Sequence, residues 1–243
     1  MNNSEIKKLP VITIFSLAFR TPIIYREALL KVLILPALLL IALDYLDTYY
    51  AHTLLKSLLV MIVYFFVYSY FAVSVHRIIL LDERHQNIVI PRLSFRVLLY
   101  SVWLWGIVIV AGLIFLPWFL FHEMLLEKLE SERLYQIFLY MGSLPCFFII
   151  AKVSLILPAI ALDRHPTWLW AWKASRHNNW QMFVIAGILP FLFGNLELLI
   201  PDDAPSLVTE IIFSALYLFL VIIEVSALSL SYKYLVLGKR ELK

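Results

Sequence analysis

The main pattern along this chain is a series of long apolar stretches separated by short polar loops. A transmembrane helix needs about 20 apolar residues to cross roughly 30 Å of hydrocarbon. Six stretches meet this requirement, namely residues 29–46, 54–81, 97–121, 137–162, 182–200 and 209–237. The pattern therefore predicts an all-α membrane bundle of six transmembrane helices, which forms a single domain over residues 1–243.

Proline residues are expected to kink four of these helices. They lie inside the predicted spans at Pro36, Pro117, Pro145, Pro158 and Pro190. Each removes a backbone donor, which a membrane bundle tolerates when neighbouring groups satisfy the freed carbonyl. Residues 1–28 contain only a short apolar run that ends at Arg20. We expect this segment to be a cytosolic or interfacial leader, because it is too short to cross the bilayer.

The distribution of basic residues predicts the orientation of the bundle. Sixteen of the twenty Lys and Arg residues fall on one side of the predicted spans and three on the other, while Lys152 lies within a span. Cytosolic loops carry the excess of Lys and Arg in membrane proteins. Both termini are therefore expected in the cytosol. The basic residues are spread over several loops as orientation signals, so nucleic-acid binding is not expected.

Composition supports a membrane protein over a soluble one. Apolar residues make up 63% of the chain and charged residues 15%, against about 45–50% and about 25% in soluble domains. The single cysteine, Cys146, lies inside an apolar stretch. An intrachain disulfide is therefore impossible, and the cysteine says nothing about the redox compartment.

Two ionisable residues lie deep inside predicted spans. Lys152 precedes Asp163 by eleven residues and Glu224 precedes Lys233 by nine, which places both roughly 13–17 Å from the cytosolic boundary. A lone charge at such depth costs at least about 2.5–3.5 kcal/mol. We therefore expect Lys152 and Glu224 to pair, either as a lock between the fourth and sixth helices or as a proton or ion site.

Two cytosolic boundaries carry similar residues, LDERH at 81–85 and LDRH at 162–165. This likeness fits either an old duplication of a two-helix unit or a chance match of short interfacial sequences. Just before the first boundary, Arg77 closes the second span. Its long side chain is expected to reach the lipid phosphates from there.

The loop after the fourth span is rich in tryptophan. Thr167 is placed to cap a short helix that brings Trp168 and Trp172 to one face. One interpretation is an aromatic belt at headgroup depth. The other is a surface helix that binds anionic lipid through Lys173 and Arg176.

Enzyme signatures are absent from the sequence, including HExxH, GxSxG, a P-loop and paired cysteines at zinc-binding spacing. His122, Glu123 and Glu127 fall on successive turns of one expected helix. A solvated acidic face explains them better than a metal site, which needs more ligands. We therefore predict no catalytic residue, no metal and no cofactor.

Three segments resemble a known family. They are AVSVHRIILLDE at 72–83, LILPAIALD at 155–163 with AWKAS at 171–175, and ALSLSYK at 227–233. They are similar to the YciC-like family of bacterial inner-membrane proteins and to the membrane domain attached to some glycerophosphodiester phosphodiesterases. Asp82 stands where the family pattern usually has Gly. The resemblance implies a six-helix inner-membrane protein with a role in envelope or lipid homeostasis, and no phosphodiesterase domain is attached.

The sequence thus favours a non-enzymatic envelope protein of the bacterial inner membrane, whose partners are the lipid bilayer, a bound phospholipid or another membrane protein. One alternative is a small transporter or channel in which Lys152 and Glu224 line a polar path. A weaker alternative is an intramembrane lipid enzyme.

Overall fold

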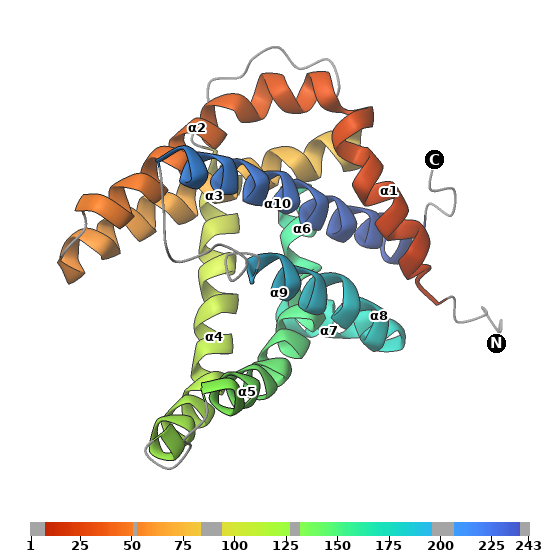
Figure 1. The fold of residues 1–243 in the computed structure, drawn as a ribbon. Helices are drawn as coiled ribbons and strands as arrows, with labels where there is room; N and C mark the ends of the chain where they lie inside the picture. The colour runs from red at the N-terminus through yellow and green to blue at the C-terminus, as the bar shows by residue number, and fades with distance from the viewer. Residues whose placement is uncertain (1–7, 51–52, 84–93, 127–131, 196–206, 239–243) are drawn as a thin grey trace.

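A computed structural model describes residues 8–50, 53–83, 94–126, 132–195 and 207–238. The described residues form helices and their connections and contain no strand, so the predicted all-α class is confirmed. The elements in chain order (Figure 1) are α1 (Val11–Ile24), α2 (Arg26–Tyr50), α3 (Leu54–Leu81), α4 (Phe95–Leu126), α5 (Glu132–Val153), α6 (Ile156–Ala161), α7 (Trp168–Ser175), η1 (Arg176–Asn178), α8 (Asn179–Phe183), η2 (Val184–Ile188), α9 (Leu189–Gly194) and α10 (Leu207–Leu235).

Five helical segments of the described chain are long and apolar enough to cross a membrane. They are Arg26–Asp47, Leu54–Leu81, Phe95–Phe121, Tyr140–Ala161 and Ile211–Leu235. These five correspond to the first, second, third, fourth and sixth predicted spans. A membrane-spanning helical bundle is therefore the architecture that the structure supports.

The fifth predicted span, residues 182–200, is described only as far as Asn195. Its described part belongs to a helical run in three pieces, from Asn179 to Gly194, so a crossing over the full length stays a prediction. The run contains the π-helical turn η2, whose following residue Leu189 donates its N–H to the Val184 carbonyl. Pro190 has no N–H to donate and crowds the carbonyl four residues earlier, which explains why regular α-helix fails here. Residues 196–200 lie outside the described part.

The fourth predicted span is also interrupted. Helices α5 and α6 are separated by a turn at Ser154 and Leu155. The Leu157 N–H donates to the Ser154 carbonyl over 3.0 Å, a tighter turn than an α-helix makes. Pro158 follows directly and cannot donate to that carbonyl, so the proline accounts for the break. Pro36, Pro117 and Pro145 lie inside α2, α4 and α5, where the helices continue through them.

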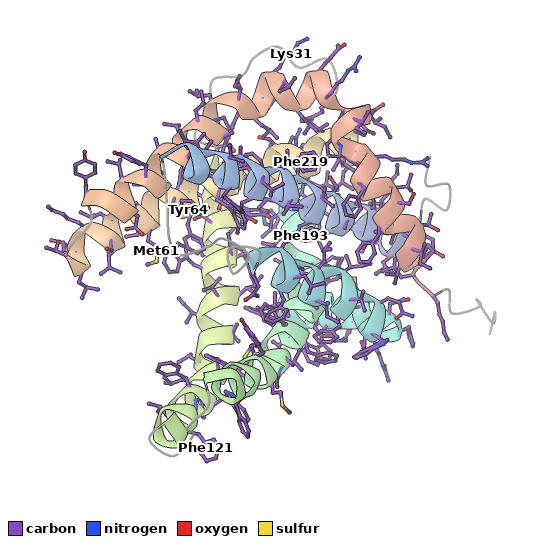
Figure 2. The ribbon with its side chains drawn as sticks, in the orientation of Figure 1. Lys31, Met61, Tyr64, Phe121, Phe193 and Phe219 are labelled. Carbon is purple, nitrogen blue, oxygen red and sulfur yellow. The ribbon has the colours of Figure 1, made fainter. Side chains whose placement is uncertain are left out.

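Two helical hairpins and one central helix organise the molecule. Helix α2 packs on α3, and α4 packs on α5, while α10 contacts α1, α2, α3, α6, η2 and α9. Figure 1 shows the α2–α3 and α4–α5 hairpins pointing in different directions from the region around α10. Figure 2 places Met61 near the far end of the first hairpin and Phe121 near the far end of the second. Helix α10 therefore joins parts of the fold that otherwise diverge.

The buried core is concentrated at one end of the long helices. In α3 the buried residues all lie between Ser69 and Leu80, whereas Leu54 is 78% exposed. In α10 every residue from Val225 to Tyr232 is buried, whereas Ile211 and Ile212 are exposed. The buried end adjoins the basic loops. The opposite halves present apolar side chains outward, as expected for helices that face lipid.

Helix α1 corresponds to the predicted leader. Its 14 residues span about 21 Å at 1.5 Å per residue, which is too short to cross a bilayer. Ile14, Ala18 and Thr21 are buried on one face, and α10 is the main neighbour of the helix. Ile12 and Ile23 are 85% and 69% exposed on the other face. This one-sided burial fits a helix that lies along the membrane interface.

Candidate functional site

A network of ion pairs connects the ends of α3, α4 and α6 at the basic side of the molecule. The Arg96 Nε–H donates to Oδ1 of Asp163 over 2.6 Å and Nη2–H to Oδ2 over 2.5 Å. Arg77 Nη1 lies 3.8 Å from Asp163 Oδ2, and the Arg77 guanidinium also binds Glu83. Four charges from three segments therefore form one cluster.

This network changes the role expected for Arg77. The Arg77 side chain is only 21% exposed. Besides Glu83 and Asp163, it donates to the carbonyl of Ala161, the last residue of α6, over 3.2 Å. Basic side chains stabilise the unpaired carbonyls at helix C-termini. The structure therefore uses Arg77 to hold α3 against α6, instead of extending it toward lipid phosphate.

Both copies of the repeated boundary sequence adopt the same unusual backbone. Asp82, after α3, has φ 55°, and Asp163, after α6, has φ 59°. This left-handed conformation ends many helices and favours Gly, with Asp and Asn tolerated. The preference explains how Asp82 can stand where the resembled pattern has Gly. The shared left-handed backbone fits both a duplication and a chance match, because any two helix ends can adopt it.

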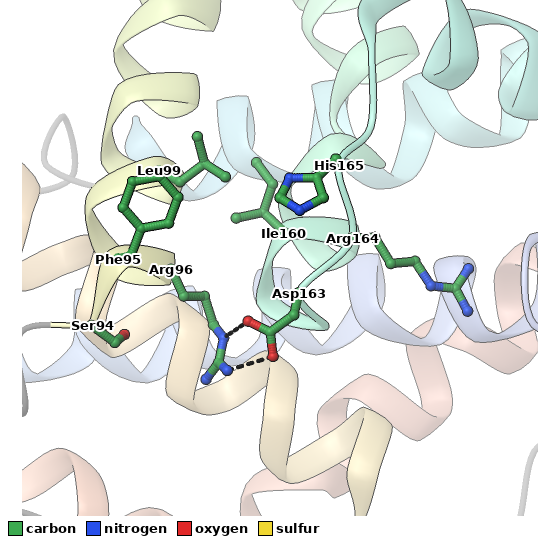
Figure 3. Close-up of a pocket in the computed structure, with 8 residues that line it drawn as sticks. All are labelled: Ser94, Phe95, Arg96, Leu99, Ile160, Asp163, Arg164 and His165. Atoms are coloured by element: carbon green, nitrogen blue, oxygen red, sulfur yellow. Dashed lines mark hydrogen bonds and ion pairs between the residues drawn. The ribbon is translucent and has the colours of Figure 1, made fainter.

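A pocket of about 340 Å³ opens beside the ion-pair network. Figure 3 shows Phe95, Leu99 and Ile160 as its apolar lining, with the paired Arg96 and Asp163 below them. The remaining lining residues are Ser94, Arg164 and His165. Arg164 turns away from the Arg96–Asp163 pair (Figure 3), and its guanidinium lies 5.9 Å from the centre of the Tyr232 ring. The pocket is thus amphipathic, but its central basic group is already neutralised by a carboxylate.

Arg96 also shifts the acidity of its partner. Its hydrogen bonds and positive charge hold the pKa of the Asp163 carboxyl below the ordinary value, with smaller contributions from Arg77 and His165. Partial desolvation opposes this shift. The Asp163 side chain remains 59% exposed, so water screens the interaction considerably.

The tryptophan-rich loop forms the short helix that the sequence predicts. The Thr167 hydroxyl accepts the Trp170 N–H over 3.2 Å and thereby caps α7. Trp168, however, is only partly exposed and packs against Trp103 of α4, with 5.5 Å between ring centres. Trp172 is 45% exposed. Trp168 therefore packs inward against α4, whereas Trp172 belongs to the exposed face of α7.

The outward face continues through η1 into α8. It consists of six exposed residues on three consecutive elements: Leu169, Trp172 and Lys173 on α7, Arg176 and His177 on η1, and Trp180 on α8. We refer to these six residues as the basic–aromatic stripe. It combines apolar with cationic side chains, a combination that is typical of helices that bind membrane surfaces. Trp172, Lys173 and Arg176 of the predicted lipid interface belong to it.

Lys152 is placed directly beneath this stripe. The residue is only 2% exposed, and its ammonium group donates to the Oδ1 atom of Asn179. Its Nζ atom also lies 4.7 Å from the centre of the Trp172 ring, a cation–π arrangement. The Ser175 hydroxyl donates to the Lys152 carbonyl over 3.1 Å. Lys152 therefore fixes α7 and α8 to α5.

Glu224 lies elsewhere, and the expected ion pair is not formed. Among the described residues Lys152 has the partners above, and no salt bridge joins it to Glu224. Glu224 is partly buried on α10. Tyr68 of α3 is within electrostatic range of Glu224 and of Tyr217. The sequence placed Lys152 and Glu224 at similar depths in the membrane, but it could not show toward which neighbouring helix each side chain points.

A buried polar triad, which sequence reasoning missed, joins α3, α4 and α10. The Ser229 hydroxyl lies 2.7 Å from the Val225 carbonyl and 2.7 Å from Nδ1 of His76. The other ring nitrogen of His76, Nε2, lies 3.3 Å from the Tyr100 hydroxyl. All three side chains are almost fully buried. A Ser–His contact closed off in this way has no access for a substrate, and it serves to hold three helices together.

The structure does not describe the side chains of the three residues that were considered as metal ligands from the sequence. His122 and Glu123 lie in a part of α4 whose side chains are outside the description, and Glu127 lies between α4 and α5 outside the described residues. Within the described residues, no group of three His, Cys, Asp or Glu side chains could hold a metal ion. Cys146 is buried and carries a free thiol.

Comparison of the chain with models of protein families, with curated proteins and with solved structures gives no match. The resemblance noted from the sequence is therefore neither supported nor contradicted by these comparisons.

Proposed function

We propose that this protein is a non-enzymatic component of the bacterial inner membrane that binds anionic phospholipid at its cytosolic surface through the basic–aromatic stripe. The stripe is the observation that carries the proposal. It places three exposed apolar side chains and the exposed side chains of Lys173, Arg176 and His177 along the short run of α7, η1 and α8. Such a face gains free energy both from apolar insertion and from attraction to negatively charged headgroups.

The surroundings of the stripe support this function. Lys152 and Asn179 hold α7 and α8 against α5, and Trp168 and Trp170 pack inward on Trp103 and Tyr232. The stripe is therefore presented by a rigid base. A preformed binding surface loses less conformational entropy when it binds its ligand.

Lipid retention tests the proposal. The purified protein, the variant Lys173→Gln/Arg176→Gln and the control Lys56→Gln would be equilibrated with equal amounts of phosphatidylglycerol and phosphatidylcholine and compared by native mass spectrometry. Lys56 is exposed near the start of α3 and outside the stripe. We expect the double variant to lose retained phosphatidylglycerol while the control matches the wild type. Equal retention by all three proteins would reject lipid binding at the stripe.

The proposed orientation has both termini in the cytosol, as the excess of basic residues on one side favours. Five long helices alone would leave the termini on opposite sides. The proposal therefore requires the run from Asn179 to Gly194, with the residues that follow it, to complete a sixth crossing.

A labelling experiment tests this orientation. In a Cys146→Ser background, single cysteines would replace Lys8, Lys56 or Gly238 and be treated with a membrane-impermeant maleimide in intact spheroplasts. We expect only the cysteine at position 56 to react before the membrane is permeabilised. Reaction of just one of the two terminal positions would show that the termini lie on opposite sides.

A further inference from the structure

We infer that Glu224 is a proton-binding site inside the membrane, set in a group of tyrosines between α3 and α10. This inference is independent of lipid binding at the stripe. Helices α3 and α10 pack against each other. The tyrosines are Tyr64 and Tyr68 of α3, Tyr100 of α4 and Tyr217 of α10, and Tyr68 is within electrostatic range of the other three and of Glu224. We refer to these four residues as the tyrosine group.

Glu224 lies deep within the apolar part of α10. The apolar segment of α10 runs from Ile211 to Leu235. Glu224 lies thirteen residues from its start and eleven from its end, which corresponds to about 20 Å and about 17 Å along the helix axis. The carboxyl group is therefore near the middle of the hydrocarbon layer, where ionisable residues are costly and usually functional.

Glu224 has no compensating cation among the described residues. Lys152 binds Asn179 and Trp172, and His76 of α3 is occupied by Ser229 and Tyr100. The other basic residues of α3 are Arg77, which pairs with Glu83 and Asp163, and Lys56, which is exposed near the start of the helix. The nearest basic residue further along α10 is Lys233, nine positions away.

The other elements packed on α10 supply no counter-ion either. Helices α6, η2 and α9 contain no charged residue. On α1 and α2 the basic residues are exposed and lie toward the α1–α2 junction: Arg20, Arg26 and Lys31. An uncompensated carboxylate is disfavoured in an apolar medium, and such a group binds a proton instead.

The tyrosine group makes proton release feasible. Phenolic hydroxyls can donate hydrogen bonds to a carboxylate or accept one from a carboxylic acid. Glu224 is also only partly buried within the protein, unlike the fully buried His76. A carboxyl group outside any described ion pair is not held in its ionised form, so it can bind a proton.

A carbodiimide tests the inference, because this reagent enters membranes and reacts with protonated carboxyl groups. The carboxyl oxygen bonds to the central carbon of dicyclohexylcarbodiimide while the proton moves to a nitrogen. The adduct then rearranges to a stable N-acylurea, with no atom lost. Peptide mass spectrometry of the reconstituted protein would measure the labelled fraction at each carboxyl group over a series of pH values.

We expect labelling of Glu224 that falls as the pH rises, and none in Glu224→Gln. Asp163 and Glu83 are ion-paired and serve as internal controls that stay unlabelled. The variant Lys152→Met should label like the wild type. An unlabelled Glu224 at every pH, or labelling that appears only in Lys152→Met, would overturn the inference, and the second result would restore the Lys152–Glu224 pair.

The variant Tyr68→Phe provides a second measurement that does not depend on changing the carboxyl group. Loss of a hydroxyl that can stabilise the ionised form should extend Glu224 labelling to higher pH. A labelling curve that coincides with the wild type would remove the tyrosine group from the proposed site.

Discussion

The guanidinium of Arg96 meets both carboxylate oxygens of Asp163, with donor–acceptor distances of 2.6 and 2.5 Å. This two-bond contact joins the start of α4 to the second residue after α6. The backbone of Asp163 is left-handed, with φ 59°. Asp163 therefore affects stability in two ways, through the charge of its side chain and through its backbone conformation, and substitutions can distinguish them.

We predict different costs for three substitutions at Asp163. Asn tolerates the left-handed backbone but lacks the charge, so Asp163→Asn should lower the free energy of unfolding by about 0.2–1 kcal/mol, as for a screened ion pair. Ala should cost more, because it also disfavours the left-handed backbone by about 1–2 kcal/mol. Gly loses the charge but accepts the backbone freely. Thermal unfolding in detergent would rank the variants, and an Ala variant as stable as the Asn variant would contradict the backbone contribution.

The ion pair also predicts a pH dependence. The pKa of Asp163 is lowered in the folded protein, chiefly by Arg96. The pair therefore contributes its full stability above the pKa of an unfolded Asp, and this contribution is lost as the pH falls through the folded-state pKa. Asp163→Asn should remove this part of the acid dependence. Unfolding curves of wild type and variant should converge at low pH, and a constant difference at all pH values would exclude the ion pair as its cause.

Close packing at Gly187 leads to a third prediction. A Cβ atom at this position would lie 3.1 Å from the Phe147 carbonyl of α5 and 3.0 Å from the Phe183 ring. Gly187→Ala should therefore destabilise the protein by about 1–3 kcal/mol through overpacking. Gly106 of α4 has no neighbour within 4 Å of the same position, so Gly106→Ala should gain about 0.5–1 kcal/mol. Effects of the same sign in the two variants would contradict this packing.

The buried triad provides a fourth prediction. Tyr100→Phe leaves the Nε2 atom of His76 without its hydrogen-bond partner, and an unsatisfied buried group costs about 1–3 kcal/mol. His76→Phe leaves the Tyr100 hydroxyl without its partner. In the double variant neither group remains, so its loss should be smaller than the sum of the two single losses. Additive losses in unfolding free energy would show that the hydrogen bond contributes nothing.

The separation of Lys152 from Glu224 provides a fifth prediction. If the two residues paired, the double variant Lys152→Glu/Glu224→Lys would recover the stability lost in each single reversal. The structure directs Lys152 to Asn179 and Trp172 instead. We therefore expect no recovery in the yield of folded protein, measured by size-exclusion chromatography. Full recovery would establish the pair that the sequence suggested.

Much of this architecture is determined locally by the sequence. Whether a segment enters the membrane depends mainly on its own length and hydrophobicity, so five of six predicted spans are found as long apolar helices. The α7 helix was likewise predictable, because Thr167 caps it within three residues. The described part of residues 182–200 shows that hydrophobicity predicts where a segment is apolar but not whether its helix continues regularly through Pro190.

The tertiary structure alone decided which polar groups meet. Residues such as Lys152 and Glu224 are surrounded in sequence by apolar side chains on every helical face, so no periodicity shows which way they point. Their direction depends on the rotation of each helix against its neighbours, which packing determines. For the same reason, the contacts of Arg77 with Ala161 and of His76 with Ser229 join residues 84 and 153 positions apart. Each segment determines its own hydrophobicity, but the partner of a buried charge is determined by the packing of the whole bundle.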